Sequence, residues 1–157
     1  MKAFIYTLYL KTKLDIKSTQ ILTVYYLVPI IFFMVMGAVF TSVMPESKNT
    51  IIESMTIFSI TMGAIIGTPA SIIDYFKNDL RKSFKSAGIP MGVIAIAGII
   101  SGFVNLIIVS IVIFAVSPAA FDAAIPENMP VYISGFILFL TATLLIGILI
   151  GLYAKTS

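Results

Sequence analysis

Uncharged, mostly apolar residues form four long runs along the chain, which cover residues 18–45, 54–73, 86–121 and 128–154. An α-helix rises about 1.5 Å per residue and needs about 20 apolar residues to cross the hydrocarbon core of a bilayer. Every run is long enough. The pattern therefore predicts an all-α, polytopic membrane protein, a single transmembrane domain over residues 1–157 with about four spans near 21–44, 54–73, 91–116 and 131–154.

The basic residues indicate the orientation of these spans. Of the 10 Lys and Arg residues, all except Lys48 precede the first span, separate the second from the third, or follow the fourth. Cytoplasmic segments of membrane proteins carry an excess of Lys and Arg. We therefore expect a multi-pass protein of the plasma (inner) membrane, surrounded by lipid bilayer, with both its N- and C-termini in the cytoplasm.

Two cytoplasmic segments have the pattern of amphipathic helices. Before the first span, Phe4, Ile5 and Leu8 recur at helical spacing among lysines, which favours a short helix lying in the membrane interface. Between the second and third spans, Asp74 is a suitable N-cap, one face collects Phe76, Leu80 and Phe84, and Gly88 ends the helix. By contrast, residues 118–130 contain three prolines and are expected to form an irregular external loop.

Composition narrows the class of protein. The chain is 59% hydrophobic and 11% charged, its mean hydropathy is +1.09, and it contains no Cys and no His. Thiolate or imidazole metal sites and Cys or His nucleophiles are therefore excluded. The charged residues lie at the ends of the apolar runs, so the net charge of +3 gives no reason to expect a nucleic-acid partner.

The predicted spans contain no Asp, Glu, Lys or Arg. Ion-coupled transporters, voltage sensors and intramembrane hydrolases usually depend on such residues, so the sequence disfavours all three classes. A phosphate-binding loop is also absent. We expect the chain not to be an enzyme and to hold no metal and no cofactor of its own.

Uncharged polar residues remain inside the spans, and most are expected to form hydrogen bonds between helices. Asn105, in the middle of the third span, is the most notable of this group: Ser59, Thr61, Asn105, Ser110 and Thr141. Five tyrosines lie near span ends, where the ring suits lipid and the hydroxyl suits water: Tyr25, Tyr26, Tyr75, Tyr132 and Tyr153.

Three glycine pairs with the spacing G-x-x-x-G occur in the second, third and fourth spans. Glycines at positions i and i+4 clear one helix face, so another backbone can approach closely. We expect packing within the chain for at least two of the pairs, which are Gly63 and Gly67, Gly98 and Gly102, and Gly147 and Gly151. Pro29 and Pro69 lie within spans and are expected to kink them.

The order of these segments resembles the permease subunit of a bacterial ABC transporter of the ABC-2 export type. The resemblance rests on the interfacial N-terminal helix, the first two spans and the cytoplasmic stretch from Asp74 to Pro90, DYFKNDLRKSFKSAGIP. In that family a basic segment that ends shortly before a proline connects the second and third spans. The family normally has six spans, whereas this chain ends just after the fourth. A truncated gene, a shortened chain, or a half whose other helices lie on another polypeptide would each account for that difference.

The resemblance implies that residues 77–87 form a coupling helix, which docks on a separate ATP-binding subunit. The docking residues would be Phe76, Lys77, Leu80, Arg81, Lys82, Phe84 and Lys85. It also implies a second permease copy, the same or different, ATP bound by the partner, and an amphipathic cargo. The alternative is a non-transporting membrane protein, such as a scaffold, an immunity factor or a regulatory subunit, that recruits a soluble partner through its basic loop.

The predicted topology is testable with reporters. A reporter fused after Ser157 or inserted within residues 77–85 should be cytoplasmic, because those segments carry the cations. A reporter inserted at Asn49 or Asp122 should be external. An external signal from residues 77–85 would contradict the four-span arrangement.

Overall fold

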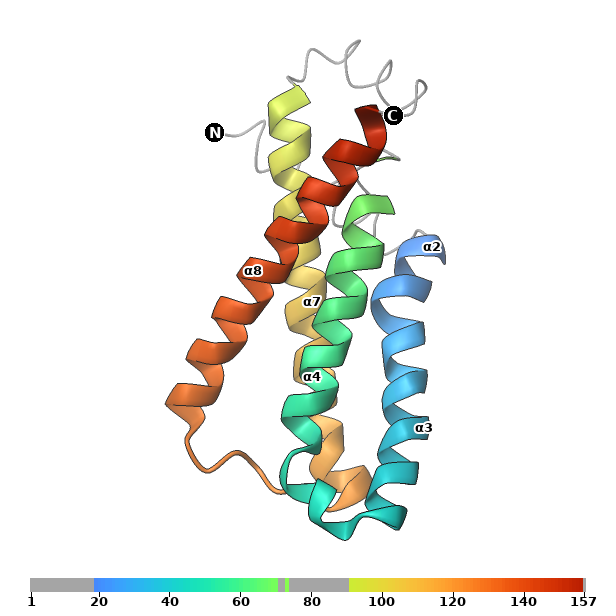
Figure 1. Cartoon of the computed structure of the whole chain (residues 1–157), viewed down its shortest axis with the longest axis vertical. Coiled ribbons are helices and arrows are strands. Elements are labelled where there is room, and N and C mark those ends of the chain that lie inside the picture. Colours follow the sequence, from blue (N-terminus) through green and yellow to red (C-terminus); the bar gives the residue numbers. More distant parts are fainter. Residues whose placement is uncertain (1–18, 71–72, 74–90, 157) are drawn as a thin grey trace.

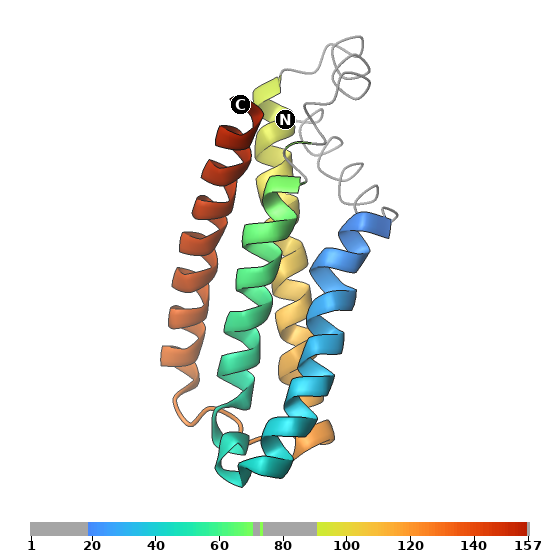
Figure 2. The same ribbon diagram turned by 45° about the vertical axis from the view of Figure 1, so that its right-hand side comes forward.

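The computed structural model describes residues 19–70, 73 and 91–156 as a bundle of antiparallel helices (Figure 1 and, turned by 45°, Figure 2). In chain order the elements are α2 (Thr19–Leu22), η1 (Thr23–Leu27), α3 (Val28–Val43), η2 (Pro45–Asn49), α4 (Ile51–Met62), η3 (Gly63–Gly67), α7 (Met91–Phe121) and α8 (Met129–Thr156). Here η1 and η3 are π-helical turns, and η2 is a 3₁₀ turn. No strand occurs in the part of the chain that the structure describes.

Within the residues that the structure describes, four helices are long and apolar enough to cross a membrane, over Thr23–Val43, Ile51–Ala70, Ile96–Phe121 and Met129–Gly151. This confirms the all-α polytopic fold. Their outer faces carry apolar side chains such as Val35 and Leu138, which are 56% and 72% exposed within the isolated chain. Lipid is the appropriate surrounding for these side chains.

The span boundaries differ by a few residues from the predicted ones, and two of the differences change the expected loops or the expected content of a span. The second helix begins at Ile51 rather than at residue 54, so Glu53 lies in its first turn and the expectation of spans without ionisable residues was wrong at this position. The third helix continues through Pro118 to Phe121, so the irregular connection is shorter than the predicted 118–130. Pro118 has no N–H to donate to the carbonyl four residues earlier, but its own carbonyl accepts a hydrogen bond of 3.1 Å from the N–H of Asp122 just after the helix end.

The helix from Ile51 to Ala70 is the centre of the bundle. In its most apolar window 56% of residues are buried, against 17% for the first span and 22% for the fourth. Two clusters of buried side chains surround it. One cluster includes Phe33, Ile52 and Ile113. The other includes Tyr25, Leu106 and Leu144.

Both prolines expected to kink a span follow a π-turn at the same spacing. The N–H of Val28 bonds to the carbonyl of Thr23, five residues earlier, and Pro29 comes next. The N–H of Thr68 bonds in the same way to Gly63, and Pro69 comes next. A proline ring clashes with the carbonyl four residues before it, and a widened turn relieves that clash. Each of the two expected kink positions thus coincides with a π-turn, which is itself a common site of helix bending.

The two π-turns contact each other through the Tyr25 ring. Tyr25 is 2% exposed, and its ring lies against both glycines of η3. A Cβ placed on Gly67 would lie 2.6 Å from a ring carbon of Tyr25. Because the glycines have no side chain where the Tyr25 ring lies, the first span can pack close to the second.

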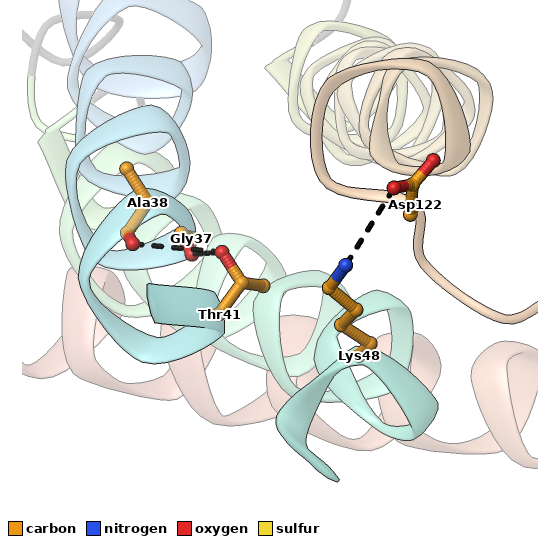
Figure 3. Close-up of polar contacts among 5 residues, drawn as sticks. All are labelled: Gly37, Ala38, Thr41, Lys48 and Asp122. Carbon is orange, nitrogen blue, oxygen red and sulfur yellow. Dashed lines mark hydrogen bonds and ion pairs between the residues drawn. The ribbon is translucent and has the colours of Figure 1, made fainter. Parts of the chain in front are cut away.

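At the end that carries η2 and residues 122–128, here called the loop end, the two connections are joined. The N–H of Ala124 donates to the carbonyl of Lys48 at 2.9 Å. Figure 3 shows Lys48 turned toward Asp122, with 3.6 Å between Nζ and Oδ2. Asp122 has φ of 51°, which an aspartate tolerates, and its side chain is 89% exposed, so the ion pair adds little stability. The backbone hydrogen bond is the more important link.

Also at this end, Gly37 of α3 accommodates the ring of Phe121, which would lie 2.6 Å from a Cβ at that position. Thr41 donates its hydroxyl to the Gly37 carbonyl at 2.8 Å (Figure 3). The Phe121 ring meets Phe33 edge to face, with ring centroids 5.3 Å apart. Phe32 and Phe58 stack between α3 and α4, with centroids 4.0 Å apart.

Packing of α8 on the central helix predicts opposite effects for two of its glycines. A Cβ at Gly147 would overlap the carbonyl oxygen of Ala64, whereas a Cβ at Gly135 would meet nothing within 4 Å. Gly147→Ala should therefore lower the free energy of unfolding by about 1–3 kcal/mol through overpacking. Gly135→Ala, the matched control, should leave it unchanged or raise it slightly. Thermal unfolding in detergent measures both, and equal melting temperatures for the two variants would contradict this packing.

Candidate binding grooves beside α8

The first half of α8 is weakly attached to the rest of the bundle. From Met129 to Phe139 no residue of α8 is buried, whereas Leu140, Leu144 and Gly147 are. In Figure 1 this first half diverges from α4 toward the loop end. The helix therefore packs through its second half and leaves space on both sides of its first half.

One of these spaces is a groove of about 330 Å³ between α4 and α8. Its walls are apolar and aromatic except at one place, where they carry a carboxyl group and two hydroxyl groups. The lining residues are Glu53, Thr56, Ile57, Ile60, Val131, Tyr132, Gly135, Phe136 and Phe139. The volume is within the range of small-molecule sites.

The polar groups of this groove lie near the loop end. Thr56 and Tyr132 join α4 to α8 by a hydrogen bond of 3.3 Å between their hydroxyls. Glu53 is one turn earlier in α4, and its Oε2 is buried without a hydrogen-bond partner among the described residues. Glu53 lies in the first turn of its helix, at the N-terminal end of the helix dipole.

The second space is a groove of about 320 Å³ between α7 and α8. It shares Tyr132 and Phe136 with the first groove, and it contains no ionisable carboxyl or amino group. The other lining residues are Ile107, Ser110, Ile111, Phe114, Met129, Ile133 and Ile137. The two grooves thus differ in charge while they have similar volume and share one helix.

Tyr25 and Tyr26 do not place their hydroxyls at the membrane surface, which corrects the expectation for these two tyrosines. Tyr25 shares a hydrogen bond of 3.2 Å with the Thr68 hydroxyl. Tyr26 donates to Oδ1 of Asn105 at 2.6 Å. Polar groups buried within a span lower their energy by pairing, and here they pair between helices. The mid-span Asn105 is therefore one end of a contact between the first and third spans.

The other polar candidates have mainly local contacts, which corrects the expectation that most of this group form hydrogen bonds between helices. The hydroxyls of Thr61, Ser110 and Thr141 donate to the carbonyls of Ile57, Leu106 and Ile137 in their own helices. Back-bonding of this kind satisfies the hydroxyl inside a helix. Ser59 is fully buried, and its Oγ has no partner in the described part of the chain.

The glycines of the three G-x-x-x-G pairs have different surroundings. Gly63 and Gly67 lie under Tyr25, and Gly147 lies against the Ala64 carbonyl. A Cβ at Gly102 would be in ordinary contact, 3.5 Å from the Tyr25 hydroxyl. Gly98 is partly exposed and Gly151 is buried.

The expected docking residues from Phe76 to Lys85 lie outside the described residues, and so does the expected interfacial helix at the N-terminus. Glu53 is the site residue that the sequence reasoning missed. The signal was present, since Ile51 and Ile52 extend the apolar run on the far side of this single carboxylate.

Comparisons with known proteins add no relative to this picture. No family model, no curated protein and no solved structure matches the chain. The fold and the four spans define the class, an all-α integral membrane protein that crosses the bilayer several times.

The contact between the first and third spans is testable with a double-mutant cycle. Tyr26→Phe and Asn105→Ala should each destabilise the protein, because each removes one end of the 2.6 Å hydrogen bond. The coupling energy should be about 0.6–1.7 kcal/mol, the range of hydrogen bonds between membrane helices. Unfolding of the two single variants and the double variant in detergent gives this energy. Strictly additive effects would show that the two side chains do not interact.

Proposed function

We propose that the chain is a membrane-spanning permease subunit of an ATP-binding cassette exporter that moves an amphipathic substrate. The observation that supports this best is the pair of partly open, mostly apolar grooves beside the first half of α8. An amphipathic molecule dissolves in the bilayer and reaches such grooves from the lipid. A substrate of this kind needs no continuous water-filled path through the protein.

The connectivity of the chain supports a link between the grooves and the cytoplasmic segment. Residues 71–90 connect the helix that ends at Ala70 with α7, which begins at Met91. The first of these helices lines one groove and α7 lines the other. Movement of this segment by a partner would therefore act on one wall of each groove along the length of these two helices.

The proposed source of energy is ATP bound by a separate subunit, since the sequence contains no phosphate-binding loop. In this proposal the apolar face of Phe76, Leu80 and Phe84 docks on that subunit. The surrounding cations Lys77, Arg81, Lys82 and Lys85 attract an acidic surface. A second permease copy completes the transporter, as the resemblance to ABC-2 permeases implies.

The docking face is testable with the substitution Phe84→Glu. A carboxylate buried without a partner costs several kcal/mol, so the variant should insert normally but no longer co-purify with a co-expressed ATP-binding subunit. ATP-dependent export from cells or vesicles should be lost with the complex. Phe84→Leu, which keeps the face apolar, should preserve both.

Two other outcomes separate the alternatives. Loss of membrane insertion in Phe84→Glu would show that the segment lies on the membrane surface rather than on a partner. An unaltered complex and unaltered export would contradict the docking assignment and favour a non-transporting membrane protein.

A further inference from the structure

We infer that the groove between α4 and α8 binds a hydrophobic organic cation, an amphiphile whose positive centre pairs with Glu53 and whose apolar body lies along α8. The inference concerns binding alone, and it stands whether or not the chain works with an ATPase. It depends on the charge of one wall, on the aromatic lining and on the open space within the groove.

The charge comes from Glu53. Its Oε2 is buried, and no described residue donates a hydrogen bond to it. The nearest cation in sequence, Lys48, pairs with Asp122 instead. A buried carboxylate oxygen without a donor is costly, and a cationic ligand beside it supplies the missing counter-charge. The groove thus has an unmet requirement for positive charge at the loop end.

The remaining lining suits the rest of such a ligand. Tyr132, Phe136 and Phe139 border the groove with aromatic rings, and Ile57 and Ile60 border it with aliphatic side chains. The faces of aromatic rings attract organic cations, most strongly where water is excluded. Since the carboxylate and the rings belong to one groove of about 330 Å³, a single small amphiphile would contact both.

The groove has open space beside Gly135. This glycine lines the groove, and a side chain added to it would meet no atom within 4 Å at the Cβ position. A larger residue there would fill the groove without disturbing a packed contact. The position therefore separates occupation of the groove from the charge of Glu53.

The groove between α7 and α8 serves as an internal control. Its volume of about 320 Å³ is similar, and it shares Tyr132 and Phe136, but no carboxylate lines it. It would accept neutral lipid chains without any preference for cations. A substitution confined to its wall, such as Ile111→Phe, should leave cation binding unchanged.

The test uses the full chain in phosphatidylcholine nanodiscs and tetraphenylphosphonium as the probe, with empty nanodiscs subtracted. Equilibrium dialysis should give saturable binding to the unaltered protein. Glu53→Gln should weaken the affinity at least tenfold, and Gly135→Leu should abolish saturable binding although the carboxylate is intact. Ile111→Phe should match the unaltered protein. Size-exclusion profiles and melting temperatures establish that each variant is folded.

Three results would overturn the inference. Binding that does not saturate would mean that the probe only partitions into lipid. Equal affinity in Glu53→Gln would remove the role of the carboxylate. A loss in Ile111→Phe as large as that in Gly135→Leu would place the probe in the other groove. Because no ATP-binding subunit is present, none of these results depends on transport.

Discussion

The packing of the Tyr25 ring against Gly63 and Gly67 sets the distance between the first two spans. Both glycines belong to a π-turn, and Tyr25 belongs to another, so two widened turns meet at one contact. In a bilayer, helices associate through close van der Waals contacts and internal hydrogen bonds rather than through the hydrophobic effect. The hydrogen bond between the hydroxyls of Tyr25 and Thr68 fixes the orientation of the ring in this contact. Neighbouring helices pack around the pair that it holds together.

The third and fourth spans depend on the same central helix. Leu106 of α7 joins Tyr25 at Gly63, and the backbone of α8 approaches Ala64 at Gly147. All these contacts lie in the half of the bundle away from the loop end. Once α8 is fixed there through its second half, its first half contacts α4 and α7 through partly buried side chains such as Tyr132, and none of its residues from Met129 to Phe139 is buried. Tight packing at one end thus accounts for the grooves at the other.

The grooves connect this packing to function. A carboxylate in a span is rare, because burying its charge is costly, and Glu53 lies in the first turn of its helix beside a groove. The wall opposite is the weakly attached half of α8. A site formed between one fixed helix and one less constrained helix is suited to an amphiphile that enters from the lipid. The proposed exporter and the proposed cation site both rest on this arrangement.

The sequence alone determined the all-α fold and the approximate spans, because the length of an uncharged apolar run directly reflects the thickness of the bilayer. It also marked Pro29 and Pro69 as irregular points. Only the tertiary structure showed that each proline follows a π-turn and that Tyr25 is buried. The burial of Tyr25 depends on a neighbouring helix that has glycines at the matching positions. Glu53 likewise became a site residue only through its position relative to a neighbouring helix. In the sequence, one carboxylate beside an apolar run indicates the end of a span. Only the position of α8, which forms the opposite wall, makes Glu53 part of a groove.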